Sequence, residues 1–303
     1  MTANDGAAVH RRSSHTIPSI RNHKVRDGSA PLVMLTAYDA PTARLAHEAG
    51  IDMLLVGDSV GTALLGYDST VPVTLDDIIH HAKAVRRGAP TAHVVADLPF
   101  MTYQASEAQA IANAGRLLQE AGADAVKLEG GRTMAARIRS LTEAGIPVVG
   151  HIGLTPQTAG ALGGMRVQGR DLDGALDLLA DARAVAEAGA YALVVEVVPA
   201  VLGGLITAEI DIPTIGIGAG PDCDGQVLVW TDLAGLTAKP PAEAISPRFA
   251  RQYLPLNDLL AKAFASFARD VREGAYPLPE HTYSMKEEIA ATLRARLEAG
   301  RDA

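Results

Sequence analysis

The sequence has very little of several features that would place it in a specialised class. Cys223 is the only cysteine in 303 residues, which excludes an intramolecular disulfide and favours a reducing compartment. No uncharged apolar run approaches the roughly 18 residues that a membrane-spanning helix needs. The net charge is -8 and there is no basic stripe, so we expect no nucleic-acid partner. These absences predict a cytoplasmic protein that binds neither a membrane nor nucleic acid.

Aromatic residues are also scarce, at 4% of the chain, so no platform for stacking a large ring stands out. Apolar residues, by contrast, make up 48%, which is enough for a large core. The first 25 residues are polar, and no apolar stretch follows Arg11 and Arg12 as it would in a twin-arginine signal. We therefore expect residues 1–25 to form a mobile arm rather than a targeting segment.

Strand-like and helix-like segments alternate through most of the chain. Several helical segments end in Glu-Ala-Gly just before a strand, where glycine supplies the left-handed residue that ends a helix. Eight strands alternating with helices predict an α/β fold, a single-domain (β/α)8 TIM barrel over residues 26–283, with a doubly wound open sheet as the alternative. The expected strands cover residues 31–37, 52–58, 93–97, 124–130, 146–153, 191–198, 212–218 and 225–230.

The C-terminal part is expected to be helical. Residues 255–274 have the pattern of an amphipathic helix. Residues 284–303 are charged and helical in composition, so we expect them to form a peripheral C-terminal helix outside the barrel.

Acidic side chains occur where four of the expected strands end. Asp58 follows the second strand, Asp97 ends the third, Glu129 lies in the fourth and Glu196 lies in the sixth. Lys127 is two residues before Glu129, so the two side chains face the same side of their strand. Because the chemistry of such barrels is located at the C-terminal ends of the strands, these residues are candidates for one site.

Each acid also has a structural interpretation. Asp97 precedes Leu-Pro and could cap a helix, Asp58 could close an Asx turn, and Glu129 could form only a salt bridge. Together, however, converging buried carboxylates repel, and each uncompensated ion costs on the order of several kcal/mol. Mg²⁺ would remove this cost, since it binds carboxylates together with water and substrate oxygens. The lack of a Cys/His cluster argues against zinc.

Other features of the sequence have more than one interpretation. GIGAG over residues 216–220 is not followed by a helix, so it is a loop near a ligand or another chain rather than a dinucleotide site. GGMRVQGR over residues 163–170 is typical of a mobile active-site loop. His151 ends the fifth strand, and it is either structural or a substrate contact. The run ALVVEVVPA surrounds Glu196 with valines, although glutamate is rarely fully buried unless it is paired or has a task.

Eleven segments between about residue 20 and residue 283 match one known family in order. They are MLTAYDAPTARLA, LLVGDSVG, GYDSTVPVTLDDIIHHAKAVRRGA, ADLPFMTY, AVKLEGG, PVVGHIGLTPQ, GGMRVQGR, EVVPA, IPTIGIGAG, CDGQVLVWTDLAGL and YPLPEHTY. On these segments the chain resembles the ketopantoate hydroxymethyltransferase (3-methyl-2-oxobutanoate hydroxymethyltransferase) family. The departures are small: Val60, Thr62 and Met165 stand where other members often carry other apolar or aromatic side chains.

The resemblance implies a role for each candidate residue. Asp58, Asp97 and Glu129 match the Mg²⁺ ligands of the family, and Glu196 matches the general base. The positions that match the keto-acid site are Asp58, Ser59, Asp97 and Lys127. Valines around Glu196 would desolvate its carboxylate and make it more basic, whereas a nearby cation would oppose this.

The family uses 5,10-methylenetetrahydrofolate as the one-carbon donor and forms large homo-oligomers, typically decamers. The resemblance therefore implies a folate-dependent transferase of pantothenate biosynthesis that works through a Mg²⁺-stabilised enolate of a small α-keto acid. Two alternatives remain. Lyases and mutases of the isocitrate lyase and phosphoenolpyruvate mutase group also use carboxylates at the strand ends of a barrel to hold a metal-bound enolate. They usually carry a catalytic cysteine in a KxCGH-type loop, whereas Cys223 lies in the segment PDCDGQ. A barrel kept as a structural subunit predicts loss of site acids, and all are present.

Overall fold

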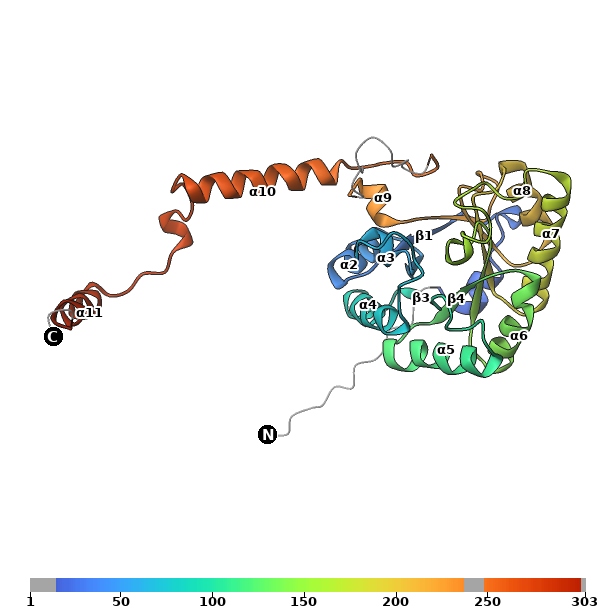
Figure 1. Ribbon diagram of the computed structural model, residues 1–303, viewed down its shortest axis with the longest axis horizontal. Coiled ribbons are helices and arrows are strands. Elements are labelled where there is room, and N and C mark those ends of the chain that lie inside the picture. The colour runs from blue at the N-terminus through green and yellow to red at the C-terminus, as the bar shows by residue number, and fades with distance from the viewer. Residues whose placement is uncertain (1–14, 237–247, 301–303) are drawn as a thin grey trace. The chain divides into compact units, whose positions relative to one another are not determined.

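The main feature of the computed structural model, which describes residues 15–236 and 248–300, is a closed barrel of parallel strands (Figure 1). Each strand pairs with the next along the chain, and the eighth pairs with the first. This confirms the predicted (β/α)8 barrel and excludes an open sheet, which would have two unpaired edges. The strands are β1 (Leu32–Thr36), β2 (Met53–Val56), β3 (His93–Asp97), β4 (Ala125–Glu129), β5 (Val148–Gly153), β6 (Ala192–Glu196), β7 (Thr214–Ile217) and β8 (Gly225–Leu228).

Helices cover the outside of the barrel between successive strands as far as β7 (Figure 1). Local sequence sets their ends: in α5, Ser106 caps the N-terminus by accepting a hydrogen bond from the Gln109 N–H, and Gly122 ends the helix with a φ of 70°. The sequence interpretation missed α8, and the structure describes no helix in residues 218–224 between β7 and β8. The helices are α2 (Ala40–Glu48), α3 (Val60–Ala63), α4 (Leu75–Gly88), α5 (Glu107–Ala121), α6 (Ala135–Glu143), α7 (Leu172–Glu187), α8 (Ala200–Glu209) and α9 (Trp230–Ala234).

Buried apolar side chains form two layers, one inside the barrel and one between the strands and the helices. Within β6, Val194 belongs to the inner layer, whereas Leu193 and Val195 belong to the outer one. A strand that is covered on both sides reads as a nearly continuous apolar run, which explains the valine-rich sequence around Glu196. This strand ends at Glu196, two residues earlier than predicted, because Val197 adopts a left-handed conformation.

Residues 15–25 lie against the barrel and not in an arm. α1 (Ile17–Arg21) is capped by Thr16, Ile20 is fully buried in the inner layer, and Lys24 forms a buried ion pair with Asp224. The predicted mobile arm over residues 1–25 is therefore wrong for residues 15–25. The polar composition of this segment gave no sign that Ile20 is buried or that Lys24 has a partner distant in sequence. Residues 1–14 lie outside the described residues.

The chain divides into two compact units, residues 1–254 and residues 255–303. The barrel unit therefore ends well before residue 283, where the sequence interpretation placed its end. Periodicity predicted the helices of the second unit but could not show to which unit they belong. The second unit contains α10 (Leu256–Arg272), a short 3-10 turn (Pro279–His281) and α11 (Glu287–Ala299). Neither long helix has a buried residue. Nowhere in the described parts is there a helix long and apolar enough to cross a bilayer.

Candidate active site

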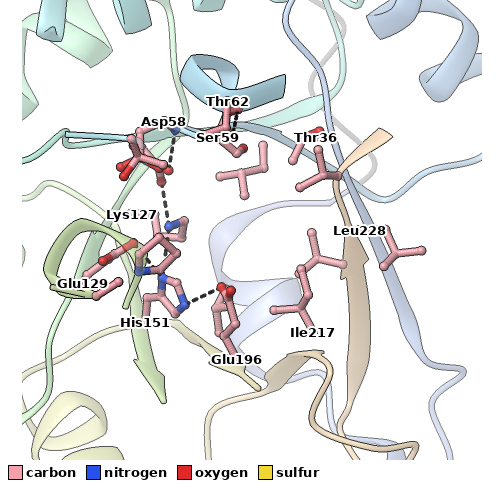
Figure 2. A pocket seen from close by; sticks show the side chains of 18 of the residues that line it. Thr36, Asp58, Ser59, Thr62, Lys127, Glu129, His151, Glu196, Ile217 and Leu228 are labelled. Carbon is pink, nitrogen blue, oxygen red and sulfur yellow. Dashed lines mark hydrogen bonds and ion pairs between the residues drawn. The ribbon is translucent and has the colours of Figure 1, made fainter. Parts of the chain in front are cut away.

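The C-terminal ends of the strands bring the predicted site residues around one cavity of about 430 Å³ (Figure 2). In the barrel register, Asp97 of β3 pairs with Lys127 of β4, and Glu129 of β4 pairs with His151 of β5. This register places acids and bases of neighbouring strands at one level. The cavity wall contains every residue that the sequence singled out for the site: Asp58, Ser59, Asp97, Lys127, Glu129, His151 and Glu196.

A buried ion pair occupies the polar side of this cavity. Lys127 Nζ is 3.0 Å from Asp97 Oδ1, and the backbone N–H of Asp58 donates to Asp97 Oδ2 at 2.9 Å. Burial lowers the pKa of Lys127, but the neighbouring carboxylates, of which Asp97 is the strongest, outweigh burial and raise it above its usual value. The lysine therefore stays charged. Burial, followed by the charges of Asp97 and Glu129, raises the pKa of Asp58 well above its ordinary range.

Gln157 connects these acids, and the sequence interpretation did not identify it. Its Nε2 donates to Asp58 Oδ2 at 2.8 Å, and its backbone N–H donates to Glu129 Oε2 at 3.0 Å. Its Oε1 accepts from the hydroxyl of Tyr103 at 2.8 Å. All of these groups are buried. Gln157 lies in the segment GLTPQ after β5, and its only sequence signal is that it follows a strand end.

His151 lies between two carboxylates. Its Nδ1 is 3.4 Å from Glu129 Oε1, and its Nε2 is 3.1 Å from Glu196 Oε2 (Figure 2). Burial and the charge of Lys127 lower the pKa of His151, but the two carboxylates outweigh them and raise it to about 9. At neutral pH the imidazole is therefore a cation that joins the acid cluster to Glu196.

The backbone around Glu196 is strained and closely packed. Val197 has a φ of 50°, which is a genuine outlier for a β-branched residue and costs on the order of 1–3 kcal/mol. The carbonyl oxygen of Glu196 accepts from the N–H of Leu154, and a Cβ on Gly153 would lie only 2.2 Å from that oxygen. Strain beside a carboxylate that enters a cavity is typical of a functional position. These contacts constrain the backbone that carries the Glu196 side chain, which is 13% exposed.

The three predicted Mg²⁺ ligands are close together but do not form a ready-made chelate. In the described part of the chain, no group of three His, Cys, Asp or Glu side chains is spaced to hold one ion. The donors nevertheless fit a hard cation. They are buried carboxylates, and apart from its ion pair with Lys127, Asp97 Oδ1 has no partner in hydrogen-bond geometry among the described residues. Mg²⁺ commonly takes only one or two carboxylates together with substrate oxygens and water. The ligand set Asp58, Asp97 and Glu129 stays a prediction.

The GIGAG loop brings an aromatic ring into the cavity wall. Gly218 has a φ of 65°, and a Cβ there would lie 2.7 Å from the ring of Phe249. The close neighbour of this backbone is therefore a side chain of the same chain. Phe249 lines the cavity and packs against the inner layer of the barrel. Sequence reasoning missed Phe249 because it lies outside the strand pattern.

A likeness to solved structures shows the fold. A phosphoenolpyruvate phosphomutase from Streptomyces platensis subsp. rosaceus superimposes with a TM-score of 0.56 over 95% of this chain and 99% of that chain. The sequence identity is 15%, so the likeness concerns the barrel and not its chemistry.

Sequence comparisons are more specific. The 3-methyl-2-oxobutanoate hydroxymethyltransferase of Shouchella clausii (strain KSM-K16) is 54% identical over 86% of this chain and 92% of that protein. The enzyme of the same name from Geobacillus kaustophilus (strain HTA426) is 52% identical over 87% of this chain and 93% of that protein. A family model described as ketopantoate hydroxymethyltransferase matches residues 14–279. The chain therefore belongs to the ketopantoate hydroxymethyltransferase family.

Proposed function

We propose that the protein transfers a one-carbon unit from 5,10-methylenetetrahydrofolate to 3-methyl-2-oxobutanoate and so forms 2-dehydropantoate for pantothenate biosynthesis. The observation that carries this proposal is that one cavity gathers Lys127, the three acids expected to bind Mg²⁺ and Glu196. Relatives that are 54% and 52% identical bear the name of this activity, which supports the assignment.

Lys127 and Ser59 are suited to bind the keto acid. The charge of the buried lysine attracts the substrate carboxylate, and the Ser59 hydroxyl lines the same cavity. Tyr38 Oη lies 2.8 Å from Ser59 Oγ, and burial raises the pKa of Tyr38, so this phenol keeps its proton. When Tyr38 donates to Ser59, the serine keeps its own proton for the substrate.

Glu196 is placed to remove the proton from C3 of the keto acid. Its carboxylate enters the cavity from the end of β6, and the strained Val197 and the hydrogen bond from Leu154 constrain the backbone at this residue. The imidazole Nε2 of His151 lies 3.1 Å from Glu196 Oε2 and helps to orient the carboxylate that accepts the proton. The carbanion formed at C3 then attacks the methylene carbon of the folate. Addition of water completes the hydroxymethyl group as tetrahydrofolate leaves.

Asp58, Asp97 and Glu129 would hold Mg²⁺, which when bound would act as a Lewis acid toward the keto oxygen of the substrate. Without a cation, burial and mutual repulsion of the acids keep the pKa of Asp58 raised. Lys127 partly offsets this repulsion, and it opposes the effect of burial on the pKa of Asp97. The residues therefore prepare a site in which added positive charge is favourable.

A direct assay tests the proposal. The purified protein is mixed with Mg²⁺, 3-methyl-2-oxobutanoate and 5,10-methylenetetrahydrofolate, and 2-dehydropantoate is measured by mass spectrometry. We expect product that depends on all three components and disappears with a chelator. Turnover without added folate, or cleavage of a carbon–carbon bond in a larger keto acid, would favour the lyase class instead.

One observation already weighs against the lyase and mutase alternative. Cys223 is the only cysteine of the chain, and it is buried in the outer layer between strands and helices, away from the residues that line the cavity. A burial-raised pKa makes this thiol a poor nucleophile. Cys223 therefore cannot take the role of the catalytic cysteine of the lyases and mutases.

We also propose that the protein acts as a cytoplasmic homo-oligomer, with the decamer expected from the family. Each unit carries apolar surface that supports association. Val33 on the outward side of β1 is exposed, and so are Phe264 and Phe267 on α10. Light scattering in solution gives the test, and a monodisperse monomer would contradict the proposal.

A further inference from the structure

The two sides of Glu196 differ in chemistry. In the barrel register, Glu196 of β6 pairs with Gly153 of β5 on one side and with Ile217 of β7 on the other. Gly153 has no side chain, and on that side the imidazole of His151 approaches instead, with its Nε2 3.1 Å from Glu196 Oε2. Figure 2 shows Glu196 between His151 and Ile217. A polar ring therefore borders the carboxylate on one side, and a branched aliphatic side chain borders it on the other.

Ile217 has a fixed place in the cavity wall. Its side chain lines the cavity, is only 9% exposed and belongs to the apolar layer inside the barrel. Val194, two residues before Glu196 on β6, also lines the cavity and belongs to the same layer. Because a close-packed interior responds to the addition of even one methylene, a substrate group that contacts Ile217 meets a surface that cannot retreat.

The proposed substrate has a different group for each of these surroundings. Its carboxylate and keto oxygens belong with the charge of Lys127, and its C3 proton must point at Glu196. C3 also carries two methyl groups, which are stabilised against apolar surface and not beside a charged ring. One of the two methyl groups therefore faces Ile217, on the side of Glu196 away from His151.

We propose that Ile217 determines substrate specificity at C3, because it leaves room there for a methyl group but not for an ethyl group. This inference rests on the proposed function and adds the residue that selects among branched α-keto acids. The competitor is 3-methyl-2-oxopentanoate, which has the same oxygens and the same C3 proton but one more methylene. The whole cavity of about 430 Å³ has room for the larger acid, so selection arises where C3 lies, beside Glu196.

Exchange of the C3 proton with D₂O gives the test, since it needs no folate. The protein, with Mg²⁺, is given both keto acids at equal concentration, and NMR follows the two initial rates. Their ratio is the ratio of the two kcat/KM values and does not depend on the amount of folded enzyme. One methylene in an apolar pocket changes kcat/KM by about 10–200-fold. We expect wild type to favour 3-methyl-2-oxobutanoate by at least about tenfold, and Ile217→Ala to remove this preference, with Ile217→Val between them.

The two enantiomers of 3-methyl-2-oxopentanoate sharpen the test. When the oxygens lie at Lys127 and the C3 proton points at Glu196, the ethyl group faces Ile217 in only one of them. The gain in Ile217→Ala should therefore occur mainly in one enantiomer. A general loosening of the barrel would raise the exchange rates of both enantiomers alike.

Ile215→Val is the matched control for Ile217→Val. Ile215 lies two residues earlier on β7 and is fully buried in the same apolar layer, but it is not among the described residues that line the cavity. This variant removes the same methyl group from the core and should leave the ratio unchanged.

Four results would overturn the role of Ile217: no preference in wild type, an unchanged ratio in Ile217→Ala, a gain shared equally by the two enantiomers, or the same shift in Ile215→Val as in Ile217→Val. Wild-type protein that exchanges the C3 proton of neither keto acid would instead overturn the proposed function together with this inference.

Discussion

Two buried lysine–aspartate pairs lie at opposite ends of the barrel and have very different surroundings. At the N-terminal end, Lys24 Nζ donates to Asp224 Oδ2 at 2.7 Å and to two backbone carbonyls. Asp224 also accepts from the backbone N–H groups of Val25 and Thr214. Both charges are fully hydrogen-bonded within the fold, as buried charges must be if they are to contribute to stability.

At the C-terminal end, the pair of Lys127 and Asp97 is left incomplete. Asp97 Oδ1 has its ion pair with Lys127 and His151 Nε2 has its ion pair with Glu196, but among the described residues neither atom has a partner in hydrogen-bond geometry. Excess negative charge from Asp58 and Glu129 surrounds the lysine. The comparison teaches that charges satisfied on all sides hold the fold together, whereas charges left unsatisfied around a cavity are available to a ligand.

Glu196→Gln gives the largest expected effect and tests whether Glu196 is the general base at the C-terminal end of the barrel. Loss of a general base lowers a rate by about 10²–10⁴-fold. We expect a loss of this size in exchange of the C3 proton of the keto acid, followed by NMR in D₂O. Because glutamine keeps the size of the side chain, the free energy of unfolding should change by less than about 1 kcal/mol. Near-normal exchange in this variant would remove Glu196 from the role of base.

Asp224→Asn and Asp97→Asn compare the two ion pairs directly. Removing one partner of a completed buried pair costs about 3–5 kcal/mol, so Asp224→Asn should lower the free energy of unfolding by this amount. Asp97→Asn removes one charge from a repelling group of acids, and its unfolding free energy should change by less than about 1 kcal/mol. Calorimetry should show instead that Asp97→Asn has lost Mg²⁺ affinity. Equal destabilisation by both variants would contradict the distinction between the two ends.

The fold and the polar side of the site could be predicted from the sequence because both follow from short-range patterns. Alternation of apolar strands with helices specifies the barrel, and acids at strand ends converge once the barrel closes. Lys127 and Glu129 are two residues apart, which is sufficient to place them on the same side. The end of β6 was misjudged because periodicity contains no information about the left-handed turn at Val197.

Residues whose partners are distant in the chain could not be predicted. Gln157 contacts Asp58 and Glu129 because the loop after β5 folds back over them. Lys24 pairs with Asp224, which is 200 residues away in the sequence. Phe249 reaches the cavity because Gly218 leaves room for its ring. In each of these cases the sequence shows a residue of ordinary type, and only the closed barrel brings its partner near.

His93 provides a pH test at the N-terminal end of the barrel. Burial lowers the pKa of this histidine to about 4, with a contribution from Arg86, while Asp124 opposes the shift. Its Nε2 lies 2.8 Å from the hydroxyl of Tyr191. Between pH 4 and pH 6.5 the unfolded chain binds a proton that the folded chain does not. The stability contribution is therefore complete above about pH 6.5 and is lost as the pH falls toward 4, by about 3 kcal/mol in total.

Urea unfolding at several pH values gives the measurement for His93. We expect His93→Gln to flatten the decline of stability between pH 6.5 and 4. His281→Gln, at an exposed position of the second unit, should leave this decline unchanged. An identical pH profile in wild type and His93→Gln would show that other groups cause the acid sensitivity.

Gln157→Leu gives the smallest expected effect. It tests how far the Mg²⁺ affinity of the acids at the C-terminal end of the barrel depends on their contact with Gln157. Leucine is close in size to glutamine but cannot donate to Asp58 Oδ2, so this carboxylate loses the contact that orients it. Partners that orient metal ligands typically contribute at least tenfold to affinity, and we expect Mg²⁺ binding to weaken by about tenfold in calorimetry. Gln119→Leu, at an exposed position of α5, is the control and should bind Mg²⁺ normally. If Gln157→Leu binds Mg²⁺ as tightly as wild type, the acids at the mouth are positioned by the barrel register alone.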